Sequence, residues 1–154
     1  MAKMKNIFLI FLLFSLFNSI DEIEYRIVNG FLGRVFDSFS VKFNRMEGII
    51  AEYEEMGDIV DDMDNMPKSK GKKIYNFTTE ELGLPNLKEL FKQFNKIDFP
   101  NETNWVDKQL FDVPYWHLIV DGKDYYSNVG TDFMTKFQKI INIYDIMNYC
   151  KDHY

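Results

Sequence analysis

Residues 34–45 read RVFDSFSVKFNR, and apolar and polar side chains alternate along them. One side of an extended chain here carries the apolar residues Val35, Phe39, Val41 and Phe43. The other side carries Ser38, Ser40 and Lys42. A period of two over this length predicts a β-strand with one buried and one solvated face. The stretch therefore predicts a sheet that packs one face against a core.

The segments on either side extend this sheet. Residues 23–28 (IEYRIV) and 49–55 (IIAEYEE) predict strands, and short turns separate them from the central one. Consecutive strands with short turns form an antiparallel meander. Residues 56–73 are acidic and then basic, which predicts a charged loop, and residues 74–77 (IYNF) predict a short returning strand.

A second antiparallel unit is predicted toward the C-terminus of the chain. Residues 115–120 and 123–129 flank Asp121-Gly122, a pair that readily adopts the positive φ angles of a tight hairpin turn. Alternation along the first strand turns three residues toward the core: Trp116, Leu118 and Val120. Residues 101–114, between the meander and this hairpin, have no regular period.

Two segments change to the helical period. Thr78 and Glu81 have the spacing of a capping box, and a helix is expected to begin near Pro85. Its apolar stripe comprises Leu87, Leu90, Phe91 and Phe94. A last helix, capped by Thr131 or Asp132, has a predicted buried face of Phe133, Phe137, Ile140, Ile141, Tyr144 and Met147. We expect an α+β fold with an antiparallel sheet of five to six strands and two amphipathic helices packed on one face.

The N-terminus has the pattern of a secretory signal. Lys3 and Lys5 precede an unbroken apolar run, residues 7–17, which is shorter than the roughly 20 residues that span a membrane. No small-x-small cleavage site follows, so an uncleaved anchor remains an alternative, as does a buried core helix. We expect residues 1–20 to be a signal peptide or N-terminal anchor and residues 21–154 to be a single α+β domain. The predicted location is the periplasm, cell envelope or extracellular space.

The charge balance limits the class of partner. Residues 21–154 contain 16 basic and 24 acidic side chains, a net charge of −8. Nucleic acids and anionic membranes bind clustered positive charge, so neither is an expected partner. Membrane association is expected only through an uncleaved N-terminal segment. Cys150 is the single cysteine, so no internal disulfide forms.

No motif in the chain dictates a reaction. Asp61, Asp62 and Asp64 are candidates for loose cation binding, but an EF-hand is excluded because Pro67 and Lys73 occupy its glycine and glutamate positions. The two histidines and one cysteine have no zinc-site spacing, and no nucleophile–base signature is present. The sequence therefore predicts a non-enzymatic protein without a cofactor.

The hairpin and last helix carry a resemblance. Residues 116–122 (WHLIVDG) and 126–130 (YSNVG), followed by the closing amphipathic helix, resemble a loose group of small, uncharacterised bacterial secreted and lipoprotein domains. Asp112 lies near a position where those domains often carry an acidic residue. This chain departs from them at Phe133-Met-Thr, where a proline is common, and it lacks a lipidated cysteine. No activity is attached to the group, so the resemblance implies only fold and location.

Two functional hypotheses follow from these observations. The first is an exported, non-enzymatic domain that binds a protein or a small ligand. Its candidate interaction surface comprises Trp105, Asp112, His117 and Tyr126. The alternative is an acidic inhibitor or immunity-type protein that neutralises a basic toxin or enzyme, since opposite charge accelerates association.

Overall fold

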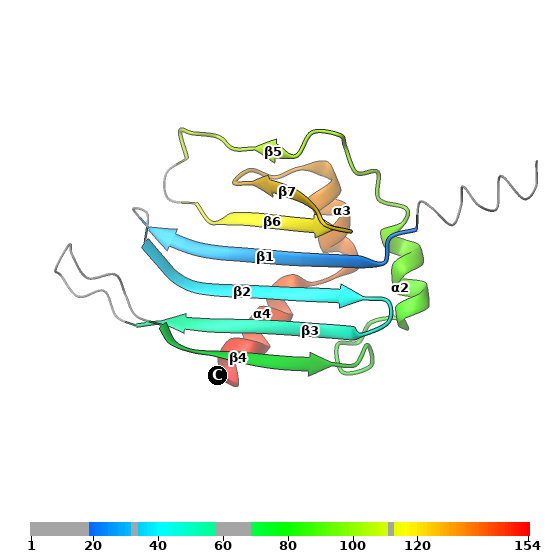
Figure 1. Ribbon diagram of the computed structural model, residues 1–154, viewed down its shortest axis with the longest axis horizontal. Coiled ribbons are helices and arrows are strands. Elements are labelled where there is room, and N and C mark those ends of the chain that lie inside the picture. Colours follow the sequence, from blue (N-terminus) through cyan, green and yellow to red (C-terminus); the bar gives the residue numbers. More distant parts are fainter. Residues whose placement is uncertain (1–18, 32–33, 58–68, 111–112) are drawn as a thin grey trace, which may run out of the picture.

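The computed structural model describes residues 19–31, 34–57, 69–110 and 113–154. In these ranges the chain forms an α+β fold in which the helices lie on one side of a single sheet (Figure 1). The order of elements is β1 (Glu22–Phe31), β2 (Arg34–Asn44), β3 (Gly48–Met56), β4 (Ser69–Phe77), α2 (Leu87–Phe94), β5 (Asn104–Trp105), β6 (Tyr115–Val120), β7 (Lys123–Ser127), α3 (Asp132–Ile140) and α4 (Ile143–Asp152).

The strands form one mixed sheet in the order β4-β3-β2-β1-β6-β7-β5. β1 pairs with both β2 and β6, so it joins the meander to the C-terminal hairpin. The prediction of five to six antiparallel strands is wrong in detail, because seven strands are described and β5 runs parallel to β7. β5 has only two residues, Asn104 and Trp105, which is too short to produce a period in the sequence.

The predicted alternation of buried and solvated side chains along β2 and β3 is confirmed. Phe39, Val41 and Phe43 are buried against the helices, while the side chain of Val35 lies outside those that the structure describes. β4 begins earlier than expected, at Ser69 rather than Ile74. Its lysines therefore lie on a strand, where the acidic residues of β3 stand opposite and compensate their charge.

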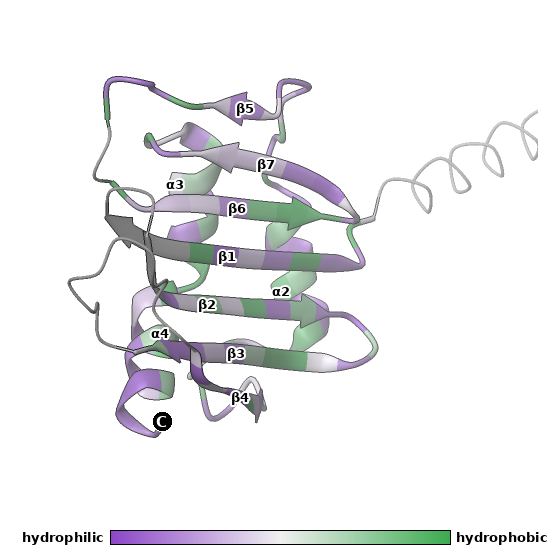
Figure 2. Ribbon diagram, turned by 60° about the vertical axis from the view of Figure 1, so that its left-hand side comes forward, coloured by the Kyte–Doolittle hydropathy of each residue, from purple (hydrophilic) through white to green (hydrophobic). Residues whose placement is uncertain are grey.

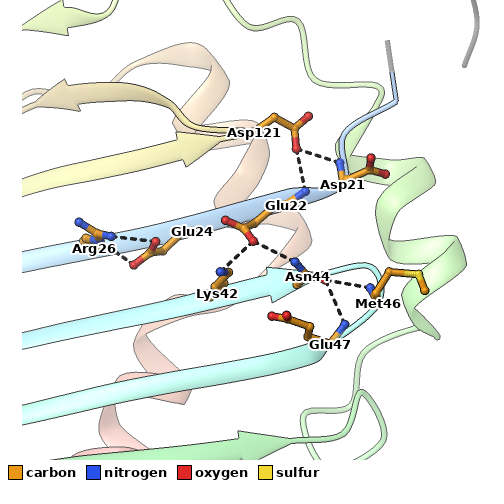
Figure 3. Close-up of polar contacts among 9 residues, drawn as sticks. All are labelled: Asp21, Glu22, Glu24, Arg26, Lys42, Asn44, Met46, Glu47 and Asp121. Atoms are coloured by element: carbon orange, nitrogen blue, oxygen red, sulfur yellow. Dashed lines mark hydrogen bonds and ion pairs between the residues drawn. The ribbon is translucent and has the colours of Figure 1, made fainter. Parts of the chain in front are cut away.

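The hairpin turn is confirmed and also has a tertiary role. Asp121 and Gly122 have φ angles of 45° and 82°, as a tight turn requires. The Asp121 carboxylate accepts hydrogen bonds from the backbone N–H groups of Asp21 and Glu22, at 3.0 and 2.8 Å (Figure 3). This turn therefore also holds the beginning of β1.

The capping box is confirmed, but it closes a single turn. The Thr78 N–H donates to the Glu81 carboxylate at 2.8 Å, and the Glu81 N–H donates to the Thr78 hydroxyl at 3.2 Å. α2 begins after Asn86, whose side-chain oxygen accepts from the Glu89 N–H. The predicted apolar stripe of α2 is buried at Leu90, Phe91 and Phe94.

The single last helix that the sequence predicts is two helices. Ile141 adopts an extended conformation, with φ of −124° and ψ of 121°, and separates α3 from α4. The break rotates the buried stripe, so α4 buries Ile143, Ile146 and Cys150. The expectation that Tyr144 is buried is therefore wrong, because 51% of it is exposed. Hydropathy alternates along the helices, as one apolar stripe per helix requires (Figure 2).

The aromatic residues form the centre of the core between sheet and helices. Phe137 on α3 contacts rings from β1, β2 and α2, namely Tyr25, Phe43 and Phe94, with ring centroids 5.7–6.4 Å apart. Among the described residues, no helix combines the length and hydropathy needed to cross a membrane. The predicted signal or anchor lies outside the described residues as far as residue 18.

Cys150 is expected to resist modification while the domain is folded. The residue is fully buried, and desolvation raises the pKa of its thiol to about 11. A thiol reagent at pH 8 should label Cys150 only after urea unfolds the protein. The folded state also keeps a proton that the unfolded chain releases above pH 9, so stability should fall as the pH rises from 9 to 11. Cys150→Ala should flatten this fall, and rapid labelling of the folded protein would contradict the burial.

Candidate functional site

The open face of the sheet carries paired charges. Glu22 binds Lys42 at 2.8 Å, and the hydrogen bond from Lys42 lowers the pKa of the Glu22 carboxyl (Figure 3). Arg26 pairs with Glu24 and Lys72 pairs with Glu52 on the same face, and the His117 ring contacts the Asp124 carboxylate there. Because acids and bases alternate, this face does not concentrate the negative charge of the chain.

Two of the predicted interaction residues lie together on this open face. The register of β6 and β7 places His117 opposite Tyr126, and their ring centroids are 4.5 Å apart. The His117 Nδ1 atom lies 3.0 Å from the Asp124 carboxylate, and Tyr115 stacks on Tyr126 at 5.4 Å. Desolvation raises the pKa of the Tyr126 phenol. The hydrogen bonds that the structure describes for the His117 ring go to the Asp124 carboxylate, which fixes the orientation of the ring on this face.

The other predicted site residues do not join this cluster. Trp105 packs on the helical side of the sheet, against Tyr125 and Phe133, at centroid distances of 6.3 and 5.2 Å. Asp112 lies outside the described residues, as do the cation candidates Asp61, Asp62 and Asp64. In the part of the chain that is described, no group of three or more His, Cys, Asp or Glu residues is arranged to hold a metal ion.

A groove of about 890 Å³ lies along the C-terminal half of β4. The turn at residues 81–84, the end of α3 and the first turns of α4 complete its lining. The apolar residues of its lining are Ile74, Tyr75, Phe77, Leu82, Leu84, Ile140, Ile141, Ile146 and Tyr149. Its polar side chains are Asn76, Glu81, Gln138, Lys139, Asn142 and Asp145. A groove of this volume that combines apolar and polar lining residues is typical of ligand-binding sites.

Tertiary contacts fix the walls of this groove. The Tyr149 ring on α4 packs edge-on against Phe77 and Tyr75 on β4, at centroid distances of 5.4 and 6.4 Å. The Tyr75 hydroxyl donates to the Cys150 carbonyl oxygen at 2.8 Å, which holds α4 under the edge of the sheet. The capping box of Thr78 and Glu81 fixes the turn at the other end.

Sequence reasoning missed this groove because it forms where three distant segments meet. The capping box and the helical stripes were visible, but the break at Ile141 that positions α4 was not. The only local signal was an apolar residue, Ile74, on the polar side of β4. It is 57% exposed.

Comparison of the chain with known family models, curated proteins and solved structures gives no match. The fold and the surfaces described above are therefore the basis for any functional inference.

Proposed function

We propose that this protein is an exported, non-enzymatic binding domain that recognises a protein segment or a small ligand in the groove beside β4. The observation that supports this proposal is the groove itself, whose lining includes the apolar residues Leu82, Ile140 and Ile146. At its margin the Tyr149 side chain on α4 is 46% exposed, and Ile74 on the edge strand β4 is 57% exposed, with its side chain on the open side of the sheet. Exposed apolar surface that borders a groove is characteristic of interaction sites.

The polar groups of the groove favour binding over catalysis. Hydrogen bonds from the backbone and the hydroxyl of Thr78 lower the pKa of the Glu81 carboxyl, so this group stays charged at neutral pH. A general acid or base needs a pKa near the working pH, which is the opposite shift for a carboxyl. Asp145 accepts a hydrogen bond from the Asn142 side chain and is exposed. The proposed role of both carboxylates is to orient a ligand.

Export and the inhibitor alternative rest on the sequence. The basic and apolar pattern of residues 3–17 supports export. The net charge supports an acidic inhibitor, but on the described open face Glu22, Glu24 and Glu52 are paired with basic side chains, so this face does not favour that role. The groove is therefore the more specific basis for a function.

A fragment screen tests the proposal. Full-length protein labelled with ¹⁵N is mixed with a library of small organic fragments, and amide shifts are recorded by NMR. Hits are expected to shift the signals of residues 74–77 and 145–149. Leu82→Trp, which places an indole in the groove, should abolish these shifts. Leu110→Trp is the matched control at an exposed leucine outside the groove, and it should leave them unchanged. Hits that shift only the His117 and Tyr126 signals would contradict the proposal.

A further inference from the structure

We infer that the groove takes an extended, basic segment of a partner protein, which adds to the outer edge of β4 as a further strand of the sheet. This inference rests on the proposed function of the groove as a binding site, and it names the occupant and the mode of recognition. Strand addition combines main-chain hydrogen bonds to a sheet edge with pockets for alternate side chains. Each of these features has a counterpart at β4.

Among the described strands, none lies beside the outer edge of β4. β4 ends the sheet and pairs with β3 on one side only. In antiparallel pairs, residues alternate between those that bond to one neighbouring strand and those that bond to the other. The bonds from the Arg45 N–H to the Asp21 carbonyl and from the Asp121 N–H to the Glu22 carbonyl fix this alternation. The registers carry this alternation from β1 through β2 and β3 to β4. On β4, the backbone groups of Ile74 and Asn76 consequently point away from β3.

Only the C-terminal half of this edge is open. The N-terminal half has the features that protect edge strands, namely lysines at positions 70, 72 and 73 and an irregular register opposite Glu55 and Met56. In addition, the Tyr154 hydroxyl donates to the Gly71 carbonyl oxygen at 2.8 Å. The lysines that protect this edge end at residue 73, and the lining of the groove begins at the next residue, Ile74.

The groove lies where side chains of an added strand would point. Successive residues of a strand alternate between the two faces of the sheet. An additional strand beside Ile74 and Asn76 would direct every second side chain toward the helical layer. There it would meet Leu82, Ile146 and Tyr149. The occupant therefore has apolar residues at alternate positions.

Charge indicates that the remaining positions are basic. Glu81 and Asp145 line the groove, and neither forms an ion pair within the described part of the chain. Lys139 is the single basic residue of the lining, and the whole chain has a net charge of −6. Lysine or arginine on the occupant would complement the two carboxylates. A second copy fits less well, because its own β4 is open only from Ile74 to Phe77.

The test uses capped nonapeptides in which Val, Ile, Leu or Phe alternates with Lys or Thr, measured against full-length protein by fluorescence polarisation. The tightest peptide is then resynthesised with N-methyl groups on one or the other set of alternate amides. One methylated set should weaken binding about tenfold or more, since it removes the donors that face β4, and the other set should have little effect. An equivalent peptide with Glu in place of Lys should bind more weakly.

Protein variants test the same contact from the other side. Ile74→Pro removes an outward-facing donor without removing a bond to β3, and proline is tolerated on the open side of edge strands. It should weaken the peptide about tenfold, whereas Ile74→Thr, which keeps the N–H group, should change affinity by less than about threefold. Glu81→Gln with Asp145→Asn keeps the capping acceptors and removes both charges. This pair should weaken the Lys peptides and reduce their salt dependence.

The outcomes separate this inference from the proposed function. If the peptides bind but neither N-methylation nor Ile74→Pro matters, strand addition is wrong while the groove remains a binding site. The same holds if fragments reach the groove and no peptide does. If neither fragments nor peptides reach it, both proposals fail. A dimer in light scattering that Ile74→Pro dissociates would overturn the partner segment in favour of a second copy.

Discussion

Phe137→Ala is expected to lower the free energy of unfolding by about 3–5 kcal/mol, the usual cost of deleting a buried phenylalanine ring. Phe137 is fully buried at the centre of the core. It stacks on Tyr25 and Phe94 and meets Phe43 edge-on, so its removal leaves a cavity lined by three rings from different elements. Urea denaturation followed by far-UV circular dichroism measures the change.

Tyr144→Ala is the matched control for Phe137→Ala. The sequence predicts both residues on one buried helical face, whereas the structure exposes 51% of Tyr144. Its truncation should change the unfolding free energy by no more than about 0.5–1 kcal/mol. Equal losses for the two variants would mean that α3 and α4 form one continuous helix, contrary to the break at Ile141.

Asn128→Ala is expected to lower the free energy of unfolding by about 2–3 kcal/mol, because it leaves several polar backbone groups without partners. The buried Asn128 side chain accepts from the Asp107 N–H at 2.7 Å and donates to the Asp107 carbonyl oxygen at 2.8 Å. A longer contact reaches the Leu110 carbonyl oxygen at 3.4 Å. These bonds hold the segment after β5 against the end of β7.

Two controls define the role of Asn128. Asn128→Asp keeps the acceptor and loses the donor, so it should have an intermediate effect. Asn101→Ala removes an exposed asparagine and should be close to neutral. Hydrogen exchange of residues 105–110 should accelerate in Asn128→Ala before global unfolding. Unchanged exchange in this segment would show that other contacts hold it.

Local patterns predicted much of the sheet. Alternation in residues 34–45 and 49–55 identified β2 and β3 because each strand has one wet and one dry face. Asp121-Gly122 identified the hairpin, and its two-residue turn fixes the register that places His117 opposite Tyr126. This pair was predicted as part of an interaction surface, and the structure brings it together on the open face.

Other features gave no local signal. The parallel pairing of β5 and β7 joins residues far apart in the sequence: the Tyr126 N–H donates to the Thr103 carbonyl oxygen, and the Ser127 hydroxyl donates to the Trp105 carbonyl oxygen at 2.7 Å. The N-terminal half of β4 reads as a charged loop because its lysines lack apolar neighbours. It forms a strand beside β3, where Glu55 and Glu52 form ion pairs with Lys70 and Lys72.

The sequence by itself determined the class of the fold, the strands of the meander and hairpin, and the apolar stripe of α2. These features depend on periodicity and turn chemistry within a few residues. Only the tertiary structure decided which strand became the open edge, where the last helix broke and how the groove formed. The physical reason is that an edge is defined by the strand that is missing beside it. A groove is defined likewise by segments such as β4 and α4, which are distant along the chain and meet only when the layers pack.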